Sequence, residues 1–148
     1  MSLISSYKTD IRLTQALSEG KSVEEDPGWD ILHEAVWAAA DEFTGEVSHS
    51  VKDFYGRTFY ADWAISTPEI PRGIGINVDR KTGQVMFVYD SYGLEGYERR
   101  IQEIKDRVLQ NYSAIAVSKA LSLLNYEVDV VEEKHATGGK KVIVTGVL

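Results

Sequence analysis

The longest regular pattern in this 148-residue chain is a run of apolar residues at three- and four-residue steps between Leu94 and Leu124. That spacing places the apolar side chains on one face of an α-helix. Charged and polar residues occupy the opposite face, so the helix is amphipathic and needs an apolar surface to lie on. The apolar positions include Ile101, Ile104, Val108, Tyr112, Ile115, Ala120 and Leu124. The pattern predicts one long helix that covers a sheet.

Ahead of this helix, apolar and other residues alternate in segments 59–65, 74–78 and 85–89. A period of two indicates strands with one buried face. Consecutive strands joined by tight turns, such as Asp79–Gly83, are antiparallel. A second apolar stripe, with Trp37 in it, predicts a shorter helix from Asp30 to Phe43, capped by Asp30.

The C-terminal segment reads as a hairpin, with strands at 128–130 and 142–144 and a loop at His135–Gly139. Residues 7–17 fit either an edge strand or a helix. The order of elements predicts an α+β fold in a single domain over residues 1–148. We expect a two-layer sandwich with a mostly antiparallel sheet, one long amphipathic helix and one shorter N-terminal helix.

Charge and composition narrow the range of possible partners and compartments. The formal net charge of −7 repels a phosphate backbone, so we expect no nucleic-acid partner. No apolar run approaches the ~20 residues that cross a bilayer, and the first ten residues lack the features of a secretory signal. The absence of cysteine fits a reducing compartment. We therefore expect a cytoplasmic protein with no membrane contact.

Two glycine motifs and the three histidines indicate no cofactor or metal. Gly73-Ile74-Gly75 lacks the third glycine of a dinucleotide fingerprint. Gly138-Gly139-Lys140-Lys141 lacks the first glycine and the hydroxyl residue of a phosphate loop, and it precedes a strand. None of the three histidines is paired at metal-ligand spacing, and no cysteine is present.

Two carboxylates are candidates for acid–base chemistry. Asp62 and Asp90 stand on the mixed face or at the end of an apolar strand, where a charge is costly unless it is paired. Such an environment shifts the pKa of a catalytic carboxyl. The alternatives are a solvated sheet face or an ion pair with Arg57 or Arg99, and we favour these over catalysis.

The most aromatic stretch of the chain runs from residue 54 to residue 63. Alternating aromatic residues in a strand usually face the core, which we expect of Phe59 and Trp63. Exposed tyrosines beside arginine are typical of binding surfaces. The candidate binding residues are Tyr55, Arg57, Tyr60, Tyr92 at the corner before the long helix, and Arg99.

Several short motifs occur in a characteristic order: Tyr55–Thr58 with Ala61-Asp62, then Asp90–Glu95, Gln110–Ser113 and Asn125–Val128. In this order they resemble the hypothetical chloroplast reading frame thirty-five family, a domain of unknown function found in plastid genomes, cyanobacteria and other bacteria. The similarity covers residues 50–148. Ahead of it, Lys8–Ile11 is similar to the family's opening strand, which favours β-structure there.

Members of this family have a shorter beginning, so the resemblance implies that residues 18–30 are a loop insertion. It implies no established activity, cofactor or catalytic residue. It does imply an adaptor role beside an ATPase of the AAA+ type.

The sequence therefore leaves three hypotheses for the function. The first is a small non-catalytic binding or adaptor domain that holds a protein partner on its sheet face or edge. The second is a small-ligand-binding protein or enzyme with a cleft formed by Asp62, Asp90 and Arg57 or Arg99. The third is a homo-oligomer that buries the sheet face.

We predict no saturable binding of ATP or GTP at Gly138-Gly139-Lys140, because a hairpin turn does not present a helix N-terminus to phosphate. Isothermal titration calorimetry on the full chain tests this. Saturable nucleotide binding that is lost in Lys140→Ala would contradict it.

Overall fold

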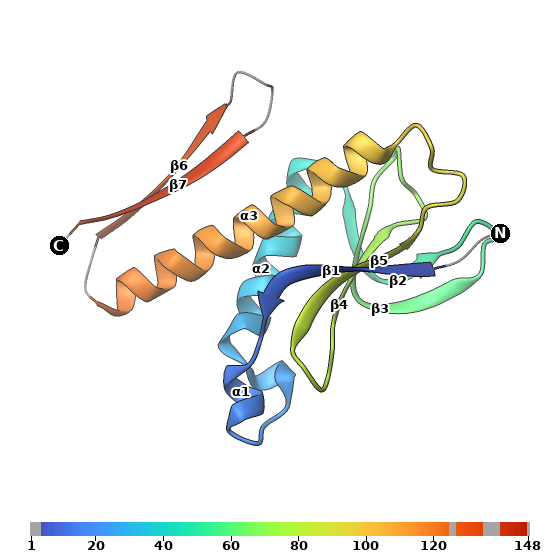
Figure 1. Cartoon of the computed structure of the whole chain (residues 1–148). Helices are drawn as coiled ribbons and strands as arrows, with labels where there is room; N and C mark the ends of the chain where they lie inside the picture. The colour runs from blue at the N-terminus through green and yellow to red at the C-terminus, as the bar shows by residue number, and fades with distance from the viewer. Residues whose placement is uncertain (1–3, 125–126, 135–139, 148) are drawn as a thin grey trace.

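The computed structural model describes residues 4–124, 127–134 and 140–147 (Figure 1). The predicted α+β fold with an antiparallel sheet and a long C-terminal helix is confirmed. The elements follow in the order β1 (Ile4–Arg12), α1 (Gln15–Ser18), the 3₁₀-helix η1 (Val23–Glu25), α2 (Pro27–Glu42), β2 (Glu46–Lys52), β3 (Thr58–Ser66), β4 (Ile74–Val78), β5 (Gln84–Asp90), α3 (Glu98–Leu123), β6 (Glu127–Lys134) and β7 (Lys140–Val147).

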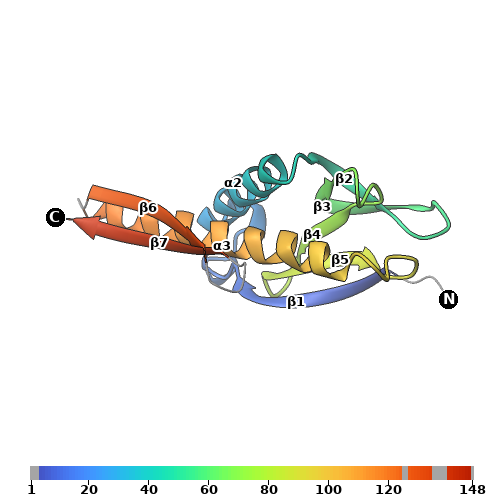
Figure 2. The same cartoon turned by 90° about the horizontal axis from the view of Figure 1, so that it is seen from above.

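The central sheet has the strand order β1-β5-β4-β3-β2, and every neighbouring pair is antiparallel. Helices α2 and α3 lie side by side on one face of this sheet (Figures 1 and 2). Side chains from both helices and from the strands beneath them form the main core. Its largest fully buried members include Leu32, Val36, Ile65, Ile76, Phe87 and Ile104.

The second face of the sheet carries a small apolar cluster of its own. Val51 packs there with Ala61, Ala64 and Val88. Gly75 makes this approach feasible, because a Cβ at this position would lie 2.5 Å from Val88 Cγ2 and 2.9 Å from Val51 Cγ2. The register of β2 against β3 shifts between Ser48 and Ser50, and such bulges bend strands. The β2–β3 hairpin therefore curls over the face that no helix of the described residues covers.

Helix α2 begins three residues earlier than the sequence pattern predicts, and Asp26 rather than Asp30 is its cap. Asp26 Oδ1 accepts a hydrogen bond from the Gly28 N–H at 2.8 Å, and Oδ2 accepts one from the Ala16 N–H at 2.9 Å. One buried carboxylate thus starts α2 and also holds α1. Asp30 lies in the first turn, where a negative charge is still favourable.

The segment at residues 7–17 contains both of the structures its pattern allowed. It forms the second part of β1 and then the start of α1. Leu13, between the two, is buried, and its N–H donates to the Gly83 carbonyl at 2.8 Å. The change from strand to helix is therefore fixed by the β4–β5 turn.

Only the first part of α3 covers the central sheet. Its buried residues are Ile101, Ile104, Arg107, Val108 and Ala114, and the apolar residues near its end, such as Leu123, are exposed. The second part extends past the sheet and runs alongside β6 and β7, which form a separate two-stranded sheet (Figures 1 and 2). The predicted loop at His135–Gly139 lies outside the described residues.

Two aromatic residues predicted to be buried are exposed. Trp37 is 51% exposed, because the buried stripe of α2 runs through Leu32, Val36 and Ala39 and leaves Trp37 at its side. Phe59 is 39% exposed, because it pairs with Val51 near the end of the curled hairpin, beyond the cover of the helices. Among the described residues, no helix is long and apolar enough to cross a membrane.

Trp63 lies in the main core, as its strand pattern predicts, and is 2% exposed. Its ring packs on Trp29 at a centroid distance of 4.7 Å, and its Nε1–H donates to His33 Nδ1 at 3.0 Å. We expect Trp63→Ala to lower the free energy of unfolding by about 3–5 kcal/mol, because it leaves a large cavity.

Urea denaturation of the full chain measures this change. The matched control is Trp37→Ala, which removes the same side chain from the surface and should cost less than about 1 kcal/mol. Equal losses in the two variants would contradict the assigned faces.

Candidate functional site

The β2–β3 loop is organised by one buried carboxylate. Asp53 Oδ1 accepts hydrogen bonds from the N–H groups of Tyr55 and Arg57, both at 2.9 Å, and Oδ2 accepts one from Arg57 Nε at 2.7 Å. Gly56 has a φ of +80°, which closes the turn, and its N–H donates to the Asp53 carbonyl at 3.0 Å. The backbone of this loop is therefore fixed from inside.

The electrostatics of Asp53 follow from the same contacts. Burial raises the pKa of the carboxyl, but the hydrogen bonds from Arg57 and Tyr55 and the charge of Arg57 outweigh burial. The pKa of Asp53 is therefore lowered, and the ionised form is the one that holds the loop.

A second buried carboxylate ties this loop to the corner that follows β5. Asp90 Oδ2 accepts a hydrogen bond from the Phe54 N–H at 2.9 Å, and Oδ1 accepts one from the Tyr92 N–H at 3.0 Å. These segments are far apart in the sequence. Asp90 therefore acts as a structural clamp, with both oxygens already engaged.

Arg72, from the β3–β4 connection, adds a third tie. Its Nη2 donates to the carbonyls of Tyr92 at 2.8 Å and Asp90 at 3.3 Å. Its guanidinium carbon lies 5.9 Å from the centre of the Phe54 ring. The Lys52 N–H donates to the Arg72 carbonyl at 2.9 Å, which joins the end of β2 to the same point.

These ties gather exposed aromatic rings at one end of the sheet. Phe54 contacts Tyr92 edge-on at a centroid distance of 4.7 Å and Tyr55 at 5.3 Å. The Arg57 guanidinium lies 5.7 Å from the Tyr55 ring centre. Tyr55 is 65% exposed, and Phe54 and Tyr92 are each close to half exposed. We call Phe54, Tyr55, Arg57, Arg72 and Tyr92 the aromatic rim.

Asp62, the other candidate carboxylate, lies elsewhere and holds an ion pair. Arg80 Nη2 lies 2.7 Å from Asp62 Oδ1, Arg80 Nη1 lies 3.1 Å from Oδ2, and the Val78 N–H donates to Oδ2 at 2.8 Å. The hydrogen bonds that Arg80 donates to the Asp62 carboxylate raise the pKa of Arg80. The Arg80 guanidinium also lies 5.2 Å from the Trp29 ring centre. Asp62 therefore fixes β3 to the start of the β4–β5 turn.

The expected ion-pair partners of Asp62 and Asp90 are wrong, because Arg57 and Arg99 bind other carboxylates. Arg57 pairs with Asp53, which is nearer in the sequence, and Arg99 pairs with Glu103 one turn along α3 at 3.6 Å. Among the candidate binding residues, the structure brings Tyr55, Arg57 and Tyr92 together. Tyr60, which is 72% exposed, and Arg99 lie outside the aromatic rim.

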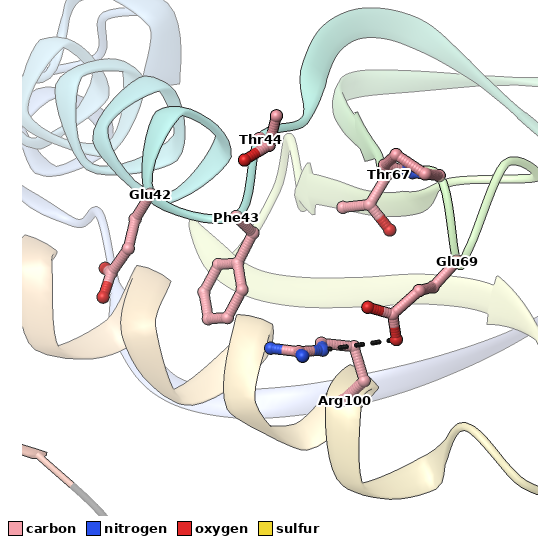
Figure 3. Close-up of a pocket in the computed structure, with 7 residues that line it drawn as sticks. Glu42, Phe43, Thr44, Thr67, Glu69 and Arg100 are labelled. Carbon is pink, nitrogen blue, oxygen red and sulfur yellow. Dashed lines mark hydrogen bonds and ion pairs between the residues drawn. The ribbon is translucent and has the colours of Figure 1, made fainter.

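One cavity, of about 320 Å³, lies between the end of α2, the β3–β4 connection and the start of α3. Figure 3 shows Arg100 reaching across it to Glu69, with Phe43 beside it. Charged groups therefore already satisfy one another there. No candidate site residue lines this cavity.

A second cavity, of about 600 Å³, lies between β1, β5 and the start of α3, and Asp90 and Tyr92 line it. Close to it, the Lys105 amine lies 3.5 Å from the Tyr89 hydroxyl and 4.6 Å from the Tyr7 ring centre. Burial lowers the pKa of Lys105, and burial next to Tyr7 raises the pKa of Tyr89 to about 12. Asp62 does not line this cavity, so the two candidate carboxylates do not share a site.

His33 and His49 make structural contacts. His33 Nδ1 accepts the hydrogen bond from Trp63, and His49 Nδ1 lies 2.7 Å from the Asp62 carbonyl. Within the part of the chain that the structure describes, no three His, Asp or Glu residues gather in a way that could hold a metal ion.

The sequence interpretation missed Asp53 and Arg72. Asp53 had a local signal, because Asp at the first position of a turn and Gly56 at the fourth are typical of a hydrogen-bonded turn. Arg72 had none, since its role depends on contacts with Asp90 and Tyr92, about 20 residues away.

Comparison with known protein families found no matching family model, and comparisons with curated proteins and with solved structures found no match to the chain.

The lowered pKa of Asp53 predicts an acid-dependent contribution to stability. The carboxylate stabilises the fold above its unfolded-state pKa of about 3.9, and this contribution is lost as the pH falls through the lower folded-state pKa. Asp53→Asn keeps an acceptor oxygen but cannot titrate. We expect the stability of wild type to fall more steeply than that of Asp53→Asn below about pH 4.5, so that the two curves converge.

Urea midpoints measured from neutral to strongly acidic pH test this prediction. Since the other carboxyl groups are common to both proteins, only the difference between the two curves reports on Asp53. Curves that stay parallel over the whole range would show that Asp53 has an ordinary pKa.

Proposed function

We propose that this chain is a small non-catalytic binding or adaptor domain that holds a protein partner on the aromatic rim. The observation that carries this proposal is an exposed cluster of rings whose backbone is fixed by the buried carboxylates of Asp53 and Asp90. Tyrosine and arginine are the side chains that most often dominate interface energies. A surface that is already ordered loses little conformational freedom on binding.

The resemblance seen in the sequence suggests the kind of partner. An ATPase of the AAA+ type, in the cytoplasm, is the candidate that follows from it. The acidic chain, with a net charge of −7, favours a partner that presents a basic surface.

The second candidate is a small-ligand-binding protein or an enzyme. The cavity of about 600 Å³ beside Asp90 favours it, because ligand sites are concave. Against catalysis, Asp90 and Asp62 both accept hydrogen bonds that hold the fold. A general base needs a free oxygen that reaches the substrate, so we rank binding ahead of catalysis.

The test of the rim is Tyr55→Ala, with the partner captured from a lysate of the organism that encodes the chain. The Tyr55 side chain is exposed and does not contribute to the core. We expect folding to be unchanged and capture of the specific partner to weaken by about tenfold, equivalent to about 1.4 kcal/mol.

The matched control is Tyr60→Ala, which removes the same exposed side chain from β3, outside the rim. Quantitative mass spectrometry compares recovery by the three proteins. Equal recovery by wild type and Tyr55→Ala, or equal losses in both variants, would remove the rim from the proposal.

A further inference from the structure

The cavity beside the aromatic rim has a lining of one charge. It is bounded by β1, the end of β5 and the beginning of α3, and it shares Tyr92 and Asp90 with the rim and its support. Among the described residues, its lining contains three carboxylates and no basic side chain. The lining residues are Ser5, Tyr89, Asp90, Ser91, Tyr92, Leu94, Glu95, Glu98, Ile101 and Gln102.

Two of these carboxylates have capacity for a ligand. The Glu98 side chain, in the first turn of α3, makes no hydrogen bond or ion pair with another described residue. Glu95 accepts one long hydrogen bond, from the Gly93 N–H at 3.3 Å. Asp90 is buried and clamped, so it contributes negative charge rather than a free oxygen.

The basic side chains near the cavity contact other groups. Arg99 and Arg100 directly follow Glu98, but they pair with Glu103 and, for Arg100, also with Glu69. Lys105 lies further along α3 against the rings of Tyr7, Phe87 and Tyr89. Its charge weakens the negative potential of the cavity, and the three carboxylates outnumber it.

The remaining walls fit a long cationic side chain. Leu94 and Ile101 are buried apolar residues that can contact a methylene stem. The Tyr89 ring is buried and already contacts the Lys105 amine at 5.4 Å from the ring centre, whereas the Tyr92 ring is 44% exposed and can face a cationic head. The serine hydroxyls and the Gln102 amide oxygen offer further acceptors.

We propose that this cavity takes an arginine or lysine side chain of the protein partner, next to the segment that packs on the aromatic rim. The inference rests on the proposed function and specifies the chemistry of the partner. Charge complementarity selects the occupant, because the cavity lining carries three carboxylates, at positions 90, 95 and 98, while the charge of Arg57 in the rim is already paired with Asp53.

The experiment uses the full ¹⁵N-labelled chain and two capped amino acids as probes. Nα-acetyl-arginine-N-methylamide carries the charge, and the citrulline analogue has the same shape without it. We expect saturable amide shifts with the arginine probe, at concentrations on the order of millimolar, for residues 91–98 and Ser5. Added salt should weaken this binding, and the citrulline probe should give no saturable shifts.

Glu98→Gln tests the pocket directly. Removing one exposed charge should weaken binding of the arginine probe by about two- to fivefold, and Glu95→Gln/Glu98→Gln should weaken it further. The matched control Glu46→Gln removes an exposed charge at the start of β2 and should leave the affinity unchanged.

Three results would overturn the inference: no saturable shifts, equal binding of the citrulline probe, or unchanged affinity in the double variant. Each is independent of Tyr55. If Tyr55→Ala weakens partner capture while the arginine probe fails, the pocket inference is wrong and the rim stands. If the probe binds but Tyr55→Ala has no effect, the rim is wrong and the pocket is a separate site for a basic group.

Discussion

The close approach of Val51 to Gly75 is the contact on which the candidate surface depends. In the part of the chain that the structure describes, helices cover only one face of the central sheet, and an apolar second face has to be covered in another way. The curled β2–β3 hairpin covers it, and this brings the loop at residues 53–57 to the end of β5. A larger residue than glycine at position 75 would push β2 away and take the aromatic rim apart.

Buried aspartates fix the loops that the contact between Val51 and Gly75 brings together. Asp26, Asp53, Asp62 and Asp90 are all buried, and each accepts hydrogen bonds from backbone N–H groups. A buried carboxylate is tolerated only when donors surround it. For Asp26, Asp53 and Asp90 the donors come from loops and helix starts, so each of these carboxylates fixes an irregular segment. Asp62 instead accepts from Val78, the last residue of β4, and from Arg80 in the turn that follows. The two carboxylates that look catalytic in the sequence, Asp62 and Asp90, thus both make contacts that hold the fold.

The sequence predicted what local periodicity determines. The strands and the two longer helices follow from apolar spacing, and Tyr55, Arg57 and Tyr92 were selected by residue type. The sequence pattern placed the start of α2 too far along the chain, because Asp26 and Asp30 are both plausible caps. Only the contact of Asp26 with Ala16 in the folded chain identifies Asp26 as the cap. The meeting of the β2–β3 loop with Tyr92 could not be predicted, since it depends on the curl of the hairpin. The resemblance to the chloroplast reading frame family stays a prediction.

The β2–β3 loop and the β6–β7 sheet lie at opposite ends of the molecule (Figure 2), and this arrangement is relevant to the proposed adaptor role. The β2–β3 loop lies at one end of the molecule, whereas β6 and β7 lie along the far part of α3 at the other end (Figure 2). A two-stranded hairpin is marginally stable alone and depends on packing against another element, here α3. A partner on the aromatic rim would leave this second unit uncovered. The proposed adaptor role requires that two molecules be held at once, and a partner bound at one end of the molecule leaves the other end accessible.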